Sequence, residues 1–135
     1  MGHQADQQFR RRSAKFYQEL IEGFAAYAAD QFELAAKQSD GATLREHLEA
    51  IERNTGRPPK RLLGALELPD GVGPLWADFM HLHSRRGSSG FGSARITDHD
   101  IEAWQRLHSV TLSGWELEAL YKADDAYFAS QAKKS

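Results

Sequence analysis

The sequence contains no cysteine, so the chain can form neither a disulfide bond nor a thiolate metal site. It also has no apolar run near the roughly 20 residues that a membrane-spanning helix needs. Residues 1–12 are polar and lack the apolar centre of a secretory signal peptide. We therefore expect a cytoplasmic protein that does not enter a membrane.

A strong charge of either sign is absent as well. The formal net charge is -2 over 135 residues, which gives no overall field for binding DNA or an anionic membrane. The length fits one domain, and a hydrophobic share of 41% is enough for a modest core. We expect a long N-terminal helix over 1–38 and a helical domain over 39–135, or one single domain over 1–135.

The alternating pattern of β-strands is nearly missing, and helical spacing takes its place. A first helix is predicted from about Ala5 to Lys37, because its large apolar residues recur at intervals that place them on one stripe of a helix. Such a helix needs a partner for its stripe, in this chain or in a second copy. The stripe consists of Phe9, Phe16, Leu20, Phe24, Tyr27 and Leu34.

Helix-start signals divide the rest of the chain. Thr43 and Ser113 each precede a glutamate by three residues, as in a capping box, and Thr97 precedes Asp100 in the same way. Pro74 suits the first turn of another helix. The sequence therefore predicts an all-α fold of five or so helices, ending in two helices joined by a link so short that they form a helical hairpin or a corner.

No constellation of residues points to catalysis, a metal or a cofactor. His81 and His83 are two residues apart on a predicted helix, so they point to different sides and cannot share a metal ion. Asp98 and Asp100 fall in the first turn of a predicted helix, where acidic residues offset the helix dipole. The stretch 87–93 is rich in glycine and serine but has no phosphate-binding lysine, and we expect a loop.

Asp124 is the one acid predicted on the apolar side of its helix. A buried carboxylate needs a partner. We expect an ion pair or a hydrogen bond across the C-terminal helices, with Arg95 or Arg106 as the candidate partners. A catalytic role would require a second perturbed group nearby, and the sequence does not show one.

The binding residues are sought among aromatic side chains and paired arginines. Three tryptophans are many for a chain of this size, and aromatic surface is typical of partner-binding faces, although such residues more often form the core. We predict partner contacts through helix-in-groove packing. The candidates are Phe9, Phe16, Leu20, Phe24, Trp76, Phe79, Arg85, Arg86, Trp104 and Trp115.

A small DNA-binding regulator is the alternative. Its features would be the basic run Arg10–Arg12 with Lys15, and the two C-terminal helices acting as a helix-turn-helix. The second of these helices begins with Glu116 and Glu118, which would repel phosphate where a recognition helix needs polar or basic residues. Binding of nucleic acid is therefore disfavoured, and an enzyme comes third because no site for it is found.

Three late segments resemble one protein family. They are residues 96–107 (ITDHDIEAWQRL), 112–120 (LSGWELEAL) and 124–128 (DDAYF), preceded by 75–79 (LWADF), the two arginines and the glycine-rich stretch. Over roughly residues 56–130 this pattern resembles the C-terminal part of tail assembly chaperones of long-tailed bacteriophages and prophages. Asp125 departs from it, since a basic residue is usual there, and the first 55 residues match nothing recognised.

The resemblance implies a function that is not enzymatic. Proteins of this family coat the tape measure protein before tail tube subunits assemble around it, and they are absent from the mature virion. The implied partners are thus the tape measure protein and the tail tube protein, in the cytoplasm of a bacterial host. Self-association through the N-terminal helix is a further expectation.

Overall fold

The computed structural model describes residues 2–132, without the side chains of residues 2–6 and Phe9. The described residues form an all-α fold, as predicted, with six helices and one two-stranded hairpin. In chain order the elements are α1 (Gly2–Leu34), α2 (Leu44–Thr55), α3 (Lys60–Leu63), α4 (Gly73–Ser84), β1 (Ser88–Ser89), β2 (Gly92–Ser93), α5 (Asp98–His108) and α6 (Gly114–Ala132).

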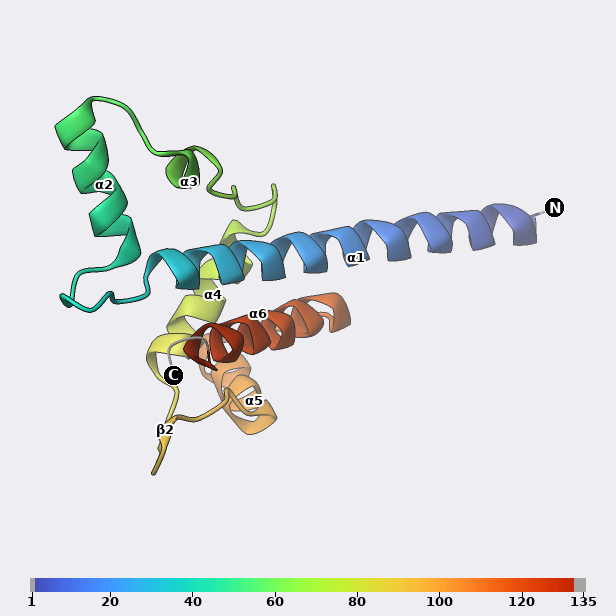
Figure 1. The fold of residues 1–135 in the computed structure, drawn as a ribbon. Helices are drawn as coiled ribbons and strands as arrows, with labels where there is room; N and C mark the ends of the chain where they lie inside the picture. The colour runs from blue at the N-terminus through green and yellow to red at the C-terminus, as the bar shows by residue number, and fades with distance from the viewer. Residues whose placement is uncertain (1, 133–135) are drawn as a thin grey trace.

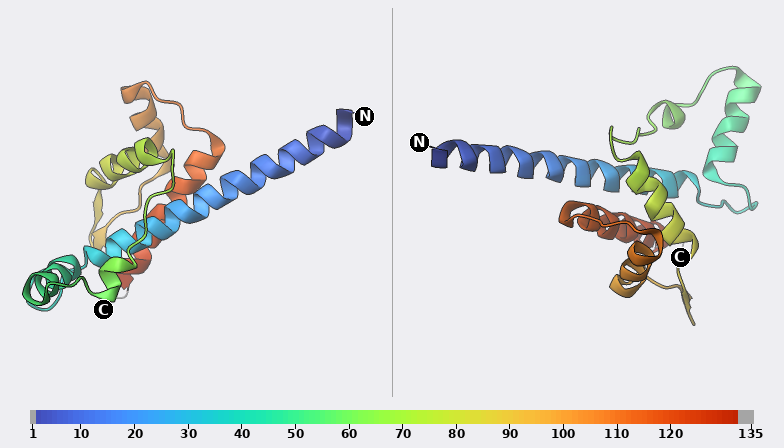
Figure 2. Two further views of the ribbon diagram at one scale, coloured as in Figure 1. Left: turned by 90° about the horizontal axis from the view of Figure 1, so that it is seen from above. Right: turned by 180° about the vertical axis from the view of Figure 1, so that it is seen from behind.

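The long helix α1 organises the molecule. It runs side by side with α6 (Figure 1). Tyr17 stacks on Trp115 near the start of α6, and Phe32 contacts Tyr127 near its end, which shows that the two helices run parallel. The N-terminal part of α1 continues past the start of α6 and projects from the body (Figures 1 and 2). The helix ends at Leu34, three residues before the predicted end.

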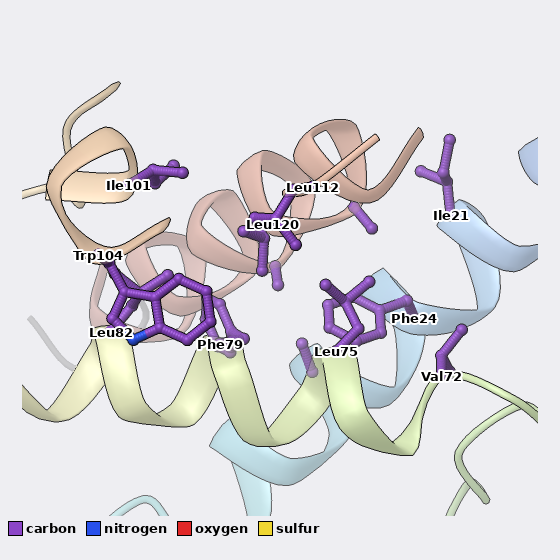
Figure 3. Packing of buried hydrophobic residues seen from close by; sticks show 13 residues of the cluster. Ile21, Phe24, Val72, Leu75, Phe79, Leu82, Ile101, Trp104, Leu112 and Leu120 are labelled. Carbon is purple, nitrogen blue, oxygen red and sulfur yellow. The ribbon is translucent and has the colours of Figure 1, made fainter. Parts of the chain in front are cut away.

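The core lies where α1, α4, α5 and α6 meet (Figure 3). Phe24 of α1 and Phe79 of α4 are fully buried, and their rings meet edge to face with centroids 6.3 Å apart. Trp104 of α5 and Leu120 of α6 close the other side. The apolar stripe of α1 is therefore covered by this chain over its middle turns.

The caps follow the local signals in the sequence. The Thr43 hydroxyl accepts a hydrogen bond from the backbone N–H of Glu46, and Thr97 forms a full capping box with Asp100. At Ser113 the arrangement differs, because its hydroxyl donates to the Glu116 carboxylate at 2.8 Å. That carboxylate also accepts the Ser113 backbone N–H, so the start of α6 is still closed.

The segment with α2 and α3 stands apart from the body, as Figure 1 shows. Asp30 of α1 anchors this segment to the body. The Asp30 carboxylate forms an ion pair with Arg61 at 2.7 Å and accepts a hydrogen bond from the backbone N–H of Leu66 at 3.0 Å. Further along, the ring of Pro69 lies directly on Gly23. A side chain at Gly23 would collide with that ring, so glycine is what lets the loop reach α1.

Residues 87–93, predicted as a loop, contain the short antiparallel pair of β1 and β2. Gly92 has a φ of 123°, a conformation that favours glycine, and Phe91 at the tip is fully exposed. The last two helices, α5 and α6, cross at an angle after their short link (Figure 2), so of the two predicted arrangements the corner is the one formed.

Candidate partner-binding surface

Two small-residue rows leave a groove between α1 and α6. Ala29 and Ala36 line it from α1 and the turn after it, and Ala126 and Ala129 line it from α6. The groove has a volume of about 330 Å³, with Glu33, Lys37, Gln38 and Ser130 as its polar rim. Small side chains let another backbone approach closely, so this surface, here named the α1–α6 groove, has the form of a site for a helix.

An aromatic pocket adjoins the groove at Ala36. Its volume is about 370 Å³, and α1, α4 and α6 all contribute to it. The ring centroids of Phe32 and Tyr127 are 5.1 Å apart. Trp76 and Met80 also line the pocket, and Met80 is 38% exposed. The pocket therefore offers an apolar socket for a large side chain at the end of the α1–α6 groove.

Three of the predicted contact residues serve the interior instead. Phe24 and Phe79 have no exposed surface, and Trp104 is buried. The Trp104 indole donates a hydrogen bond to Nδ1 of His81 at 3.0 Å, which satisfies its polar atom. The chain itself therefore covers most of the surface of these three side chains.

Other predicted contact residues do reach the surface. Phe16 is 56% exposed on the projecting part of α1, while Leu20 and Trp115 are half-buried near the start of α6. Trp76 is half-buried in the aromatic pocket, and so of the predicted residues it is the one that the structure places there. Phe9 lies on α1, but its side chain is outside the described part of the structure.

The two arginines predicted as contact residues differ in exposure. Arg85 is exposed, whereas the Arg86 side chain is only 5% exposed and pairs with Asp124 at 2.6 Å. Arg86 also donates to the carbonyl of Ala94 at 3.0 Å, and the Asp124 carboxylate accepts the backbone N–H of Ile96 at 3.2 Å. Arg86 thus fastens the hairpin segment to α6.

The predicted partners of Asp124 are corrected accordingly. Arg95 lies 4.0 Å from Asp124 and pairs at 2.7 Å with Asp125, while no ion pair joins Arg106 to any described residue. The main partner is Arg86, whose guanidinium also lies 4.4 Å from the Tyr127 ring centroid. This cluster has its hydrogen bonds filled, and no buried side-chain polar atom among the described residues lacks a partner.

His83 sits between the buried ion pair and the aromatic pocket. Its Nδ1 accepts a hydrogen bond from Nε of Arg86 at 3.1 Å. Burial, together with the positive charge of Arg86, lowers the pKa of His83 below its ordinary value, against the opposite effect of Asp124. The imidazole is therefore held neutral, with Nδ1 as an acceptor.

His81 points the other way, toward Trp104, as the spacing of the two histidines predicts. Over residues 2–132 no group of three histidine or acidic side chains is placed to hold a metal ion. In the same range no helix is both long and apolar enough to cross a membrane. What the geometry offers chemically is apolar surface with a sparse polar rim.

Sequence reasoning missed the α1–α6 groove. The alanines of α1 and α6 favour a helix by their intrinsic propensity, and this local interpretation does not indicate a groove. A signal was present, because small residues three or seven apart recur on both helices. It points to a groove only once α1 and α6 are known to lie side by side.

Comparison with known protein families indicates which family the chain belongs to. A family model described as phage tail assembly chaperone matches residues 51–129, more than half of the chain. The chain belongs to the phage tail assembly chaperone family. No curated protein and no solved structure matches it.

The family match covers the end of α2 and everything to near the end of α6. It confirms the resemblance drawn from the late segments, whose motifs lie in α4, α5 and α6. Residues 1–50 lie outside the match, and they include all of α1. One wall of the α1–α6 groove, that of α6, thus comes from the matched region of this tail assembly chaperone.

Proposed function

We propose that this chain shields the tape measure protein during phage tail assembly and helps to recruit tail tube subunits, without catalysing a reaction. The family assignment supports a chaperone role, and the α1–α6 groove with its aromatic pocket supports the means. Before tail tube subunits assemble around it, the long apolar helix of the tape measure protein needs a cover that can later be removed. A shallow groove of small residues binds a helix reversibly because it buries limited area.

The observation that carries this proposal is the pairing of alanine rows with the aromatic pocket at one end. A helix lying along Ala29, Ala126 and Ala129 would bring one of its large side chains to Trp76 and Tyr127. Aromatic anchors in pockets contribute most of the binding energy at interfaces. The site of action that follows is the host cytoplasm, where tails assemble, and not the finished virion.

The experiment is co-expression of the chain with the tape measure protein of the same phage, followed by co-purification. Ala129→Glu places a carboxylate in the α1–α6 groove, and Ala77→Glu places one on the exposed side of α4. Since both alanines lie at exposed or groove positions, neither change disturbs the core. We expect Ala129→Glu to reduce recovery of the tape measure protein about tenfold, while Ala77→Glu leaves it unchanged.

Equal recovery with both variants would refute the groove as the binding surface. Failure of the unchanged chain to retain the tape measure protein would refute the proposed partner. The DNA-binding alternative gains no support from the fold, because Glu118 stands exposed on the first turns of α6. It predicts salt-dependent binding to duplex DNA, and absence of binding at low salt removes it.

A further inference from the structure

One side of α1 carries a second exposed surface, which begins on the projecting part and runs along the helix as far as the start of the α1–α6 groove at Ala29. Its residues recur at intervals of four and three, which places them on one side of the helix. All are exposed, and Phe16 lies beside them with more than half of its surface free. This surface, here named the arm face, consists of Gln8, Arg12, Lys15, Glu19, Glu22 and Ala26.

The charges on the arm face are ordered along the helix. Arg12 and Lys15 come first, and Glu19 and Glu22 follow. Within the described residues Arg12, Lys15 and Glu19 make no ion pair, and Glu22 accepts only a hydrogen bond from Gln18 at 3.1 Å. Both halves of this pattern are therefore open to an outside partner.

We propose that a second copy of this chain occupies the arm face, with the two α1 helices antiparallel and their Phe16 side chains near the two-fold axis. Arg12 and Glu22 are equally far along the helix from Tyr17, and so are Lys15 and Glu19. An antiparallel pair centred there sets each basic residue opposite an acid of the other copy. A parallel pair would instead set like charges together, which is unfavourable.

The arrangement suits the shape of the molecule. The projecting half of α1 lies beyond the body (Figure 2), so it can run along the outer side of α1 in the second copy. Ala26 there is exposed and small, and it permits close approach. One contact then repeats twice by symmetry, as in most closed homodimers.

Sedimentation equilibrium of the full chain over a range of concentration and salt tests the proposal. We expect a dimer that weakens with salt, because exposed charges are screened. Two double variants, Arg12→Glu with Lys15→Glu and Glu19→Lys with Glu22→Lys, each place like charges opposite each other in their own dimer. Each should raise the dissociation constant about tenfold or more.

An equimolar mixture of the two double variants restores opposite charges across the pair, so it should associate nearly as well as the unchanged chain. Circular dichroism verifies that each variant remains helical. A monomer at the highest soluble concentration would overturn the proposal. So would a mixture that associates no better than its components.

Orientation is tested with cysteines, since the chain has none of its own. Gln8 and Ala26 are equally far from Tyr17, so Gln8→Cys should form a disulfide with Ala26→Cys when the two proteins are mixed. Cross-linking of Gln8→Cys to itself would show a parallel pair and overturn the proposal. Both measurements use the purified chain alone, so they stand apart from the test of tape measure binding.

Discussion

The buried ion pair of Arg86 and Asp124 gives the sharpest test of the fold. Asp124→Asn keeps the shape of the side chain and removes its charge. Both partners are almost fully covered, with 5% and 6% of their side chains exposed, so water cannot replace the lost carboxylate. Breaking a buried pair in this way costs about 3–5 kcal/mol, because the remaining charge stays buried without compensation.

Asp125→Asn is the matched control. Asp125 pairs with Arg95 at 2.7 Å, but more than half of each side chain is exposed. Exposed pairs contribute about 0–1 kcal/mol. The two variants thus make the same chemical change at neighbouring positions, and they differ in burial.

Thermal unfolding followed by circular dichroism measures both variants. We expect Asp124→Asn to lower the midpoint of thermal unfolding by roughly 10 °C or more, given about 3–5 °C per kcal/mol for a chain of this size. Asp125→Asn should lower it by no more than about 5 °C. Equal effects at the two positions would show that burial of the Arg86 pair does not govern its energy.

Two further predictions concern His83 and Gly23. Because the pKa of His83 is lowered in the fold, the unfolded chain binds its proton first as the pH falls below about 6.5, so the free energy of unfolding should drop between pH 7 and the lowered pKa. His83→Gln should flatten that drop in urea titrations, and an unchanged drop would exclude His83 as its source. Gly23→Ala puts a methyl group 2.8 Å from Cγ of Pro69 and should destabilise the fold by about 1–2 kcal/mol, despite the helix preference of alanine. Gly114→Ala, with open space around it, should be neutral or stabilising, and a Gly23→Ala variant that behaves the same way would contradict the contact.

The sequence predicted the features that depend on near neighbours. The caps at Thr43 and Thr97 are correct because a hydroxyl three residues before an amide is a local arrangement. The all-α class is confirmed for the same reason, since the period of the apolar residues is local. The acids at the start of α5 cap and complement that helix as expected, with Asp100 in the capping box.

Features that depend on contacts between distant elements could not be predicted from local sequence patterns. The stripe of α1 was predicted as one surface, yet Phe24 is fully buried and Phe16 is largely exposed. What separates them is the length of α6, which begins beside Tyr17 and leaves the earlier turns uncovered. The partner of Asp124 was predicted to be Arg95 or Arg106, and the main partner is Arg86, which lies 38 residues away and comes close because the β1–β2 hairpin segment folds back between them.

The candidate binding site shows the same limit. Trp76 was predicted to contact a partner and does line the aromatic pocket, where Phe32 and Tyr127 join it from other helices. The alanines of the α1–α6 groove come from residues about ninety positions apart. Their meaning depends on the parallel packing of α1 and α6, which no pattern within either helix specifies.

Hydrogen–deuterium exchange on the purified chain, with and without the tape measure protein, addresses the groove most directly. A helix seated between α1 and α6 should slow amide exchange at residues 29–37 and 126–131, where those two walls and the aromatic pocket meet. Exchange at the exposed turns of α5 should stay the same. A complex that forms while these two segments exchange as fast as before would contradict the account.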